Sequence, residues 1–199
     1  MTTPPVVFGI TGASGAPYAV RLLEILAQHA VPVWLIVSDH GWRLLAQECG
    51  INDQATLEAR TGAAGGRGGS SIKVFRNGDR GALPASGSQP TRGMVVCPCS
   101  MGTVSAIAQG SSRSLIERAA DVTLKERRRL ILVPREAPLS LIHLRNLMAV
   151  TEAGAVVVPA APGFYHRPDR VDQLVDFIVQ RLLDHLGLEI SMAPRWDGE

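Results

Sequence analysis

Five short apolar runs recur along this chain, and each ends in small or chemically reactive residues. The runs are Val6 to Ile10, Val33 to Val37, Met94 to Cys97, Leu130 to Val133 and Ala155 to Val158. They lead into Thr11-Gly12-Ala13-Ser14-Gly15, Ser38-Asp39-His40, Pro98-Cys99-Ser100, Pro134-Arg135-Glu136 and the segment Pro159 to Tyr165. Short apolar runs bounded by turn residues are typical of buried strands. Ligands bind outside the carboxyl ends of parallel strands, so the pattern predicts one crevice where these residues meet.

Segments with helical spacing separate the runs. Apolar residues recur at helical intervals through Tyr18 to Leu26, Trp42 to Glu48, Val104 to Ala108 and Val171 to Leu186. We expect Asp169 to cap the last helix and Gly187 to end it. Strands that alternate with helices predict a doubly wound parallel sheet with right-handed crossovers.

The length of 199 residues and the hydrophobic content of 46% suit one domain that spans residues 1–199. Residues 61–70 hold five glycines and are predicted to form a flexible loop, because strand-like Ile72 to Phe75 follows at once. Residues 188–199 are expected to form a C-terminal tail.

Composition narrows the classes of function. A formal net charge of +2 and an aromatic content of 5% do not favour binding to nucleic acid. No apolar run reaches the ~18 residues of a membrane span, and the first residues do not resemble a signal peptide, so we expect a cytoplasmic protein. The three cysteines suit reduced, buried thiols. The cysteine and histidine spacings predict no metal site.

The first turn, Gly9 to Gly15, follows a strand and opens a helix, where backbone N–H groups can meet an anion. Its spacing is not that of a dinucleotide fingerprint, and its small residues favour a mononucleotide. The alternative is a tight turn without a ligand. Ser38 and the segment Ser100 to Thr103 could likewise be ordinary helix caps. Three such turns at one sheet edge argue against an empty crevice.

A second group combines cations with a carboxylate and a phenol. It comprises Arg118, Lys125, Arg135, Glu136, Tyr165 and Arg181. Arg127-Arg128-Arg129 is interpreted as solvated surface. His166 is a candidate general base, although a histidine beside a tyrosine more often serves as a hydrogen-bonding partner.

Five segments resemble the UbiX-type flavin prenyltransferases. They are Gly12-Ala-Ser-Gly-Ala16, Pro98-Cys-Ser-Met-Gly-Thr103, Glu117 to Glu126, Val133-Pro-Arg-Glu-Ala-Pro-Leu139 and Pro159-Ala-Ala-Pro-Gly-Phe-Tyr165. The resemblance implies a flavodoxin-like or Rossmann-like three-layer sheet. It also implies reduced FMN as substrate, dimethylallyl monophosphate as prenyl donor, and a homododecamer whose sites are shared between subunits.

Site residues follow from the same resemblance. FMN would be held by Gly12, Ala13, Ser14, Ser38, Ser100, Met101, Gly102, Thr103 and Arg135. The prenyl phosphate would be held by Arg118, Lys125, Glu136, Tyr165 and Arg181. Apart from the resemblance, Trp196 is a candidate for the aromatic wall that would shield cationic character on the prenyl carbons. The chemistry would depend on Ser14, Glu48, Lys125, Glu136 and Tyr165. The family reaction joins the prenyl group to flavin N5 and C6 without a metal, and a partner decarboxylase receives the prenylated FMN.

Three alternatives stay open. A flavin-dependent cysteine decarboxylase would share the fold and FMN, but is expected to carry Pro-x-Met-Asn where this chain has Pro134-Arg135-Glu136-Ala137. A non-enzymatic FMN carrier would have no use for Lys125, Glu136 and Arg181 beside the flavin. A nicotinamide dehydrogenase is disfavoured by the glycine spacing.

Overall fold

One parallel β-sheet forms the centre of the computed structural model, which describes residues 3–62 and 72–192. Its strands are β1 (Val6–Ile10), β2 (Val33–Val37), β3 (Ile72–Arg76), β4 (Gly93–Cys99), β5 (Leu130–Pro134) and β6 (Val156–Val157). Their order is β3-β2-β1-β4-β5-β6, and every neighbouring pair is parallel. This is the Rossmann order, in which the winding direction reverses between β1 and β4. The predicted doubly wound sheet is confirmed.

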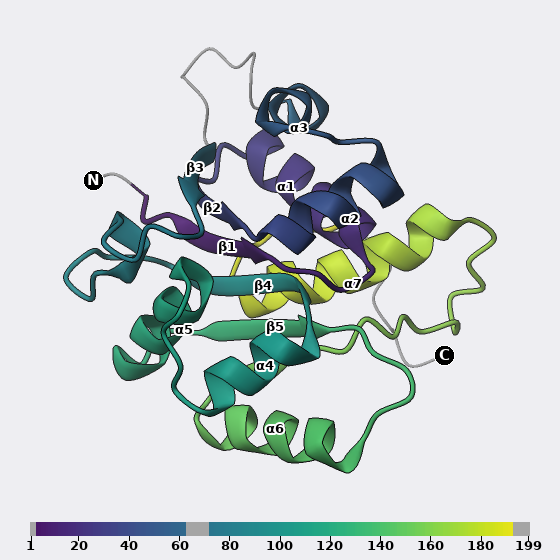
Figure 1. The fold of residues 1–199 in the computed structure, drawn as a ribbon. Coiled ribbons are helices and arrows are strands. Elements are labelled where there is room, and N and C mark those ends of the chain that lie inside the picture. Colours follow the sequence, from purple (N-terminus) through teal and green to yellow (C-terminus); the bar gives the residue numbers. More distant parts are fainter. Residues whose placement is uncertain (1–2, 63–71, 193–199) are drawn as a thin grey trace.

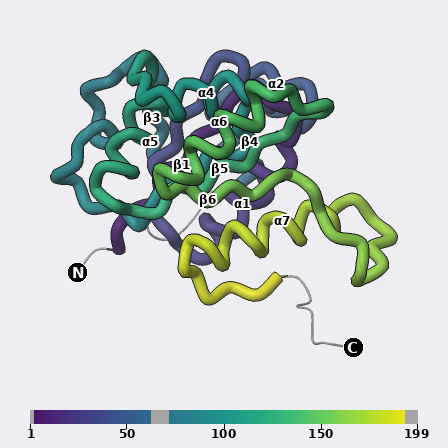
Figure 2. The backbone as a smooth tube through the Cα atoms, turned by 90° about the horizontal axis from the view of Figure 1, so that it is seen from below, coloured from purple at the N-terminus to yellow at the C-terminus, as the bar shows by residue number. Residues whose placement is uncertain are grey.

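Helices cover both faces of the sheet and complete three layers (Figures 1 and 2). One face packs against α1 (Ala16–Gln28), α2 (Asp39–Cys49), α3 (Gln54–Thr61) and α7 (Val171–His185). The other packs against α4 (Met101–Ala108), α5 (Leu115–Lys125), α6 (Leu141–Glu152) and the 3₁₀-helix η1 (Leu83–Ala85). Successive strand residues point to opposite faces, so Phe8 and its neighbour Val7 enter different cores.

The predicted strands lie within two residues of their observed bounds. Gly187 follows α7 with a left-handed φ of 66°, which confirms it as the end of that helix. The prediction that Asp169 caps α7 is wrong, because the N-cap is Arg170. The side chain of Gln173 folds back and its Oε1 accepts from the backbone N–H groups of Asp169 (2.8 Å) and Arg170 (3.4 Å).

The predicted glycine-rich loop begins where α3 ends at Thr61, and its residues 63–70 lie outside the described residues. The first part of the predicted tail returns along α7. Gln180 Nε2 donates to the carbonyl of Ile190 (2.9 Å), and the N–H of Met192 donates to Gln180 Oε1 (2.7 Å). Trp196 lies outside the described residues. In the described part of the chain, none of the helices has the length and apolarity that crossing a bilayer requires.

Candidate functional site

The ends of β1 and β4 are joined by the side chain of Thr11. Its hydroxyl donates to the carbonyl of Pro98 (3.0 Å) and accepts from the N–H of Ser100 (2.8 Å). Thr11 is buried, and both bonding capacities of its hydroxyl are used inside the protein. Thr11 is therefore no ligand donor but fixes the turns after β1 and β4 side by side. This is the point where the strand order reverses, and a ligand crevice is expected there.

Glu48 occupies the N-terminus of α1. Its Oε2 accepts from the backbone N–H groups of Gly15 (2.9 Å) and Ala16 (2.8 Å). Glu48 is the last residue but one of α2, so α2 must cross the start of α1 to bring it there. The sequence predicts an external anion at this helix end, but the anion that meets these two N–H groups is a carboxylate of the chain itself.

Ser38 and Ser100 are the N-caps of α2 and α4. Ser38 Oγ accepts from the N–H of Gly41 (3.0 Å), and Ser100 Oγ accepts from that of Thr103 (3.3 Å). The cap interpretation is therefore correct for both serines, and it does not prevent ligand binding. The N–H groups of Met101 and Gly102 form no hydrogen bond within residues 3–62 and 72–192. They remain available to an anion at the start of α4.

Within this turn, the side chains of Met101 and Ala13 are buried in the protein, so only their backbones can line a ligand. Gly12 is exposed and lies against α2. A Cβ at position 12 would come within 2.5 Å of His40 Cβ. Glycine is thus required here by the packing of the turn on α2.

Arg135 joins the end of β5 to the turn after β1. Its Nε donates to the carbonyl of Ser14 (3.2 Å), although the two residues are 121 positions apart. Glu136 points back to its own loop, where its Oε1 accepts from the N–H of Ala137 (3.1 Å), and it is exposed. The convergence of the β1 and β5 ends is confirmed, whereas Glu136 contacts no cation in the described chain.

Tyr165 belongs to an aromatic cluster formed by α7 and the loop that precedes it. The rings of Tyr165 and Phe177 meet edge to face at 5.8 Å, and His166 stacks on Phe177 at 5.7 Å. Tyr165 remains 50% exposed, so a ligand can reach it. The loop that carries it leaves the sheet beside β5, where the N–H of Ala160 donates to the carbonyl of Pro134 (3.1 Å). The Nδ1 of His166 is buried without a hydrogen-bond partner in the described residues, and a role as general base stays a prediction.

The remaining cations lie elsewhere in the fold. Arg118 and Lys125 are on α5, and Arg181 is on α7, which covers the opposite face of the sheet. Each is ion-paired to a carboxylate of its own helix or the residue after it: Arg118 to Asp121 (2.7 Å), Arg181 to Asp184 (3.2 Å) and Lys125 to Glu126. A single chain therefore does not bring Arg118 and Lys125 together with Tyr165 and Arg181.

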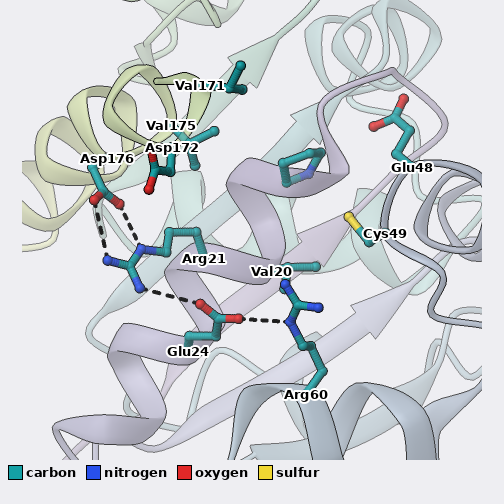
Figure 3. A pocket seen from close by; sticks show the side chains of 11 residues that line it. Val20, Arg21, Glu24, Glu48, Cys49, Arg60, Val171, Asp172, Val175 and Asp176 are labelled. Carbon is teal, nitrogen blue, oxygen red and sulfur yellow. Dashed lines mark hydrogen bonds and ion pairs between the residues drawn. The ribbon is translucent and has the colours of Figure 1, made fainter. Parts of the chain in front are cut away.

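A cavity of about 540 Å³ opens beside Glu48, between α1, α3 and α7 (Figure 3). Its charged lining is largely paired within the chain. Arg21 Nε donates to Asp176 Oδ1 (2.7 Å), and Glu24 accepts from Arg21 (3.4 Å) and from Arg60 (3.2 Å). The hydrogen bond to Asp176 is the main reason why the pKa of Arg21 is raised. These ion pairs join three helices, and they leave little unpaired charge to attract a ligand.

Two thiols lie beneath the site on β4. Cys97 and Cys99 are fully buried, and burial raises the pKa of each thiol well above its ordinary value. Burial also raises the pKa of Tyr18, with a smaller contribution from Cys97. Both thiols therefore stay protonated at neutral pH and act as core residues rather than nucleophiles. In the described ranges, no three His, Cys, Asp or Glu side chains are grouped so that they could hold a metal ion.

Comparison with known proteins gives this site a context. The Flavoprotein family model matches residues 1–183. The flavin prenyltransferase UbiX of Pseudomonas aeruginosa is 49% identical over 198 residues, which covers 96% of this chain and 93% of that protein. The chain belongs to the UbiX flavin prenyltransferases. Another UbiX flavin prenyltransferase, from Methanothermobacter thermautotrophicus, is 40% identical and covers 98% of this chain and 96% of its own.

Solved UbiX structures share the fold over the whole chain. AnUbiX (PadA1), in complex with FMN and dimethylallyl pyrophosphate, has a TM-score of 0.88 at 38% identity and covers all of both chains. A dodecameric FMN-dependent UbiX-like decarboxylase from Escherichia coli O157:H7 has a TM-score of 0.88 at 39% identity, with 98% of this chain and all of that chain covered.

Cysteine decarboxylases are more distant. The FMN-dependent cysteine decarboxylase TvaF is 14% identical with a TM-score of 0.59, over 94% of this chain and 99% of its own. At this identity the likeness shows the fold alone. The presence of Arg135-Glu136 favours prenyl transfer over cysteine decarboxylation. The UbiX relatives, which are far more similar to this chain in sequence, favour the same interpretation.

Proposed function

We propose that this protein transfers a dimethylallyl group from dimethylallyl monophosphate to N5 and C6 of reduced FMN and releases phosphate. The flavin supplies the two ring atoms that form the new bonds. The observation that carries the proposal is the contact of Arg135 with Ser14, which brings a cation to the turn after β1 at the point where the strand order reverses. The 49% identity to a UbiX flavin prenyltransferase supports it.

The residues at this edge fit the phosphate and the flat ring of FMN. The N–H groups of Met101 and Gly102 are free in the described chain, and they lie at the positive end of α4. Arg135 adds a cation, and Gly12, which lies exposed in the turn after β1, adds a backbone segment without a side chain. The further residues proposed to hold FMN are Ala13, Ser14, Ser38, Ser100 and Thr103.

Prenyl transfer requires that the allylic carbon–oxygen bond break while negative charge grows on the departing phosphate. We assign stabilisation of that charge to Arg118, Lys125 and Arg181, with a hydrogen bond donated by Tyr165. Ser14 and Glu136 are proposed to assist proton movement during ring closure. Glu48 would act through its position at the start of α1. Trp196, proposed as a wall that shields the prenyl carbons from water, lies outside the described residues.

We also propose that a second copy of the chain completes the phosphate end of the site. Arg118 and Lys125 lie on α5, across the sheet from Tyr165 and Arg181, so one chain alone cannot gather all four. The exposed face of α6 and the loop before it supplies an interface. Five large apolar side chains are exposed there: Leu139, Leu141, Ile142, Leu144 and Met148. Apolar patches of this kind mark protein interfaces. A dodecamer, as in the E. coli relative, is the assembly we propose.

The mass of the flavin tests the reaction. After anaerobic incubation of the protein with reduced FMN and dimethylallyl monophosphate, the flavin should gain the mass of one prenyl unit. The diphosphate, present in the AnUbiX complex, serves as the second donor. An unchanged flavin mass with both donors contradicts the proposal and favours the non-enzymatic FMN carrier.

Mixed oligomers test the shared site. Lys125→Ala and Tyr165→Phe should each be nearly inactive alone, and should regain activity after the two are unfolded and refolded together. Half of the copies then supply each intact residue, so about one quarter of the sites hold both. No recovery in the mixture would mean that both residues act within one chain. Ile142→Glu, placed on the exposed face of α6, should lower the molecular mass of the assembly.

The product is proposed to serve a prenylated-FMN-dependent decarboxylase, with both proteins in the cytoplasm. Co-purification of transferred prenylated flavin with an added apo-decarboxylase would test the recipient.

A further inference from the structure

Four arginines gather at the edge of the sheet that is opposite to the candidate flavin site. Arg92 directly precedes β4, and Arg127, Arg128 and Arg129 lie just before β5. Because β4 and β5 are parallel neighbours, their amino ends lie together. The N–H of Met94 donates to the carbonyl of Arg129 (2.8 Å). From the sequence, Arg127 to Arg129 are interpreted as solvated surface. In the structure, this segment lies against the amino end of β4.

Gly93 makes this close approach of the two strands possible. Its φ is 141°, and a Cβ at this position would lie 2.6 Å from the carbonyl oxygen of Arg129. Any other residue would push β4 and the segment before β5 apart. The juxtaposition of Arg92 with the three following arginines therefore depends on backbone geometry and not on a chance contact of long side chains.

These arginines line a cavity of about 520 Å³, together with His185 near the end of α7. The described residues that line it include no aspartate and no glutamate. The volume lies within the range of small-molecule sites. Lys125 and Glu126, which are ion-paired with each other, both lie beside Gly87 on the same edge, so this pair adds no net charge.

None of the four arginines forms an ion pair with a carboxylate of the described chain. One carboxyl group, that of Glu126, has a pKa that is lowered mainly by its hydrogen bond with Lys125 and to a smaller extent by the charge of Arg128. In the described chain, six other arginines form ion pairs with carboxylates, whereas none of these four does. Their partners are neutral oxygens. Arg129 Nη1 donates to the carbonyl of His185 (2.5 Å), and Arg128 donates to the carbonyls of Gly87 (2.6 Å) and Gln89 (2.8 Å). The nearest acids are engaged elsewhere: Glu126 with Lys125, and Asp184 with Arg181.

Some contacts of the four arginines cap the C-terminus of α7, but capping does not account for all of their hydrogen-bonding groups. Arg129 and Arg92 donate to the carbonyls of His185 and Gly187, at the negative end of that helix. The Nε of Arg92, however, is buried and has no hydrogen-bond partner among the described residues. The side chain of Arg127 forms no hydrogen bond or ion pair with them either, although its backbone N–H donates to the carbonyl of Leu124 (2.9 Å). A buried guanidinium N–H without an acceptor is costly, and an anion in the cavity would satisfy it.

We propose that this cavity is a binding site for a phosphate group, carried either by inorganic phosphate or by a phosphate monoester. Guanidinium groups bind phosphate oxygens through paired, charge-assisted hydrogen bonds, and several of them together suit a dianion better than a carboxylate. The site is separate from the candidate flavin site, because β5 with its five residues spans about 16 Å between the two edges.

His185 provides a probe of occupancy. Burial, followed by the charges of Arg181 and Arg129, lowers the pKa of its imidazole, while Asp184 has a smaller opposing effect. A bound anion beside Arg129 would offset the effect of the arginines and raise that pKa. The ring resonances of His185, followed by NMR over the acid range, therefore report on the cavity and not on the flavin site.

The experiment uses the full chain with one equivalent of FMN, so that the flavin site is filled. Inorganic phosphate, or glycerol phosphate as the monoester, is titrated against sodium chloride of equal ionic strength. Phosphate should raise the pKa of His185 with saturation, and chloride should not. Arg127→Gln should weaken phosphate binding about tenfold, because it removes one charge-assisted contact. Arg80→Gln, which removes an equal charge from the turn after β3, is the matched control and should bind as the wild type does.

Three results would overturn the proposal. One is an unchanged His185 titration in saturating phosphate and monoester. Another is an equal effect of chloride at matched ionic strength, which would show screening alone. The third is equal phosphate affinity in Arg127→Gln and Arg80→Gln. If Arg127→Gln does not fold, Arg92→Lys replaces it, since it keeps the charge but loses the buried Nε. If only the monoester competes for the site, the ligand is an esterified phosphate.

Discussion

The contact of Glu48 with the start of α1 leads to a prediction about stability that is independent of catalysis. Glu48→Ala removes an acceptor that receives the N–H groups of Gly15 and Ala16 at 2.9 and 2.8 Å. Loss of a helix N-cap acceptor costs about 1 kcal/mol, and loss of a negative charge at a helix N-terminus about 0.3–1 kcal/mol more. With two bonds lost, we expect the free energy of unfolding to fall by about 2 kcal/mol.

For a chain of this size, 1 kcal/mol corresponds to about 2–4 °C in Tm, so Glu48→Ala should lower Tm by about 4–8 °C. Glu48→Gln keeps an oxygen acceptor and loses the charge, so its Tm should fall by about 1–4 °C. Thermal unfolding is followed by circular dichroism at one fixed protein concentration, because the assembly proposed above would make Tm depend on it. Gln47→Ala, the exposed neighbour on α2, is the control and should stay close to the wild type.

A Tm for Glu48→Ala that equals that of Gln47→Ala would refute the capping role. The same variants separate stability from chemistry. If Glu48 acts only as a cap, both Glu48 variants should turn over at the wild-type rate at temperatures where they are folded. A Glu48→Gln enzyme that is stable and binds FMN, but transfers the prenyl group slowly, would add a role in proton movement.

Three further predictions concern the site and its surroundings. Arg135→Ala should weaken FMN binding about tenfold with little change in Tm, measured by quenching of flavin fluorescence, whereas Arg135→Lys should keep part of the affinity. Tyr165→Phe and Lys125→Ala should bind FMN but lose about 10²–10³ in single-turnover rate, with excess donor rescuing the lysine variant more than the tyrosine variant. The pKa values of Cys97 and Cys99 are raised in the native protein, so above about pH 8.5 the unfolded chain holds fewer protons than the native one. The free energy of unfolding should therefore fall as pH rises, by up to about 2.7 kcal/mol per pH unit. Urea midpoints that stay level between pH 8 and pH 10 would contradict this.

The fold could be predicted because its strands are continuous apolar runs. In a parallel sheet covered on both faces, a strand such as Val33–Val37 is buried on both sides, and the run therefore begins and ends with the strand. Elements with a weaker apolar pattern could not be predicted in this way. Helix α6 buries little more than Asn146 and Val150 and leaves apolar residues such as Ile142 exposed, so its pattern has no clear inward face.

The flavin end of the site was also predictable, because strand topology alone brings the ends of parallel strands together. The turns at Ser14 and Arg135 meet for that reason. The contact of Glu48 with the start of α1 could not be predicted from the sequence. Its contact with Gly15 depends on how α2 crosses α1, and nothing in the local sequence records a crossing angle. The N-cap of α7 was predicted from the residue type alone. The side chain of Gln173 accepts from the backbone N–H groups of both Asp169 and Arg170, and this contact is not visible in the type of a single residue.

The two parts of the proposed reaction, flavin binding and prenyl transfer, require different parts of the fold. Holding the flavin requires only the carboxyl edge of one sheet, and Thr11 and Arg135 assemble that edge within a chain. Lys125 lies near the amino edge, beside Gly87, and about a strand length separates it from the Ser14 turn. If Lys125 acts on the prenyl phosphate, it must therefore act in the site of a neighbouring copy. Closed symmetry then gives every chain one complete site, whereas a dissociated chain keeps its flavin-binding edge and loses prenyl transfer.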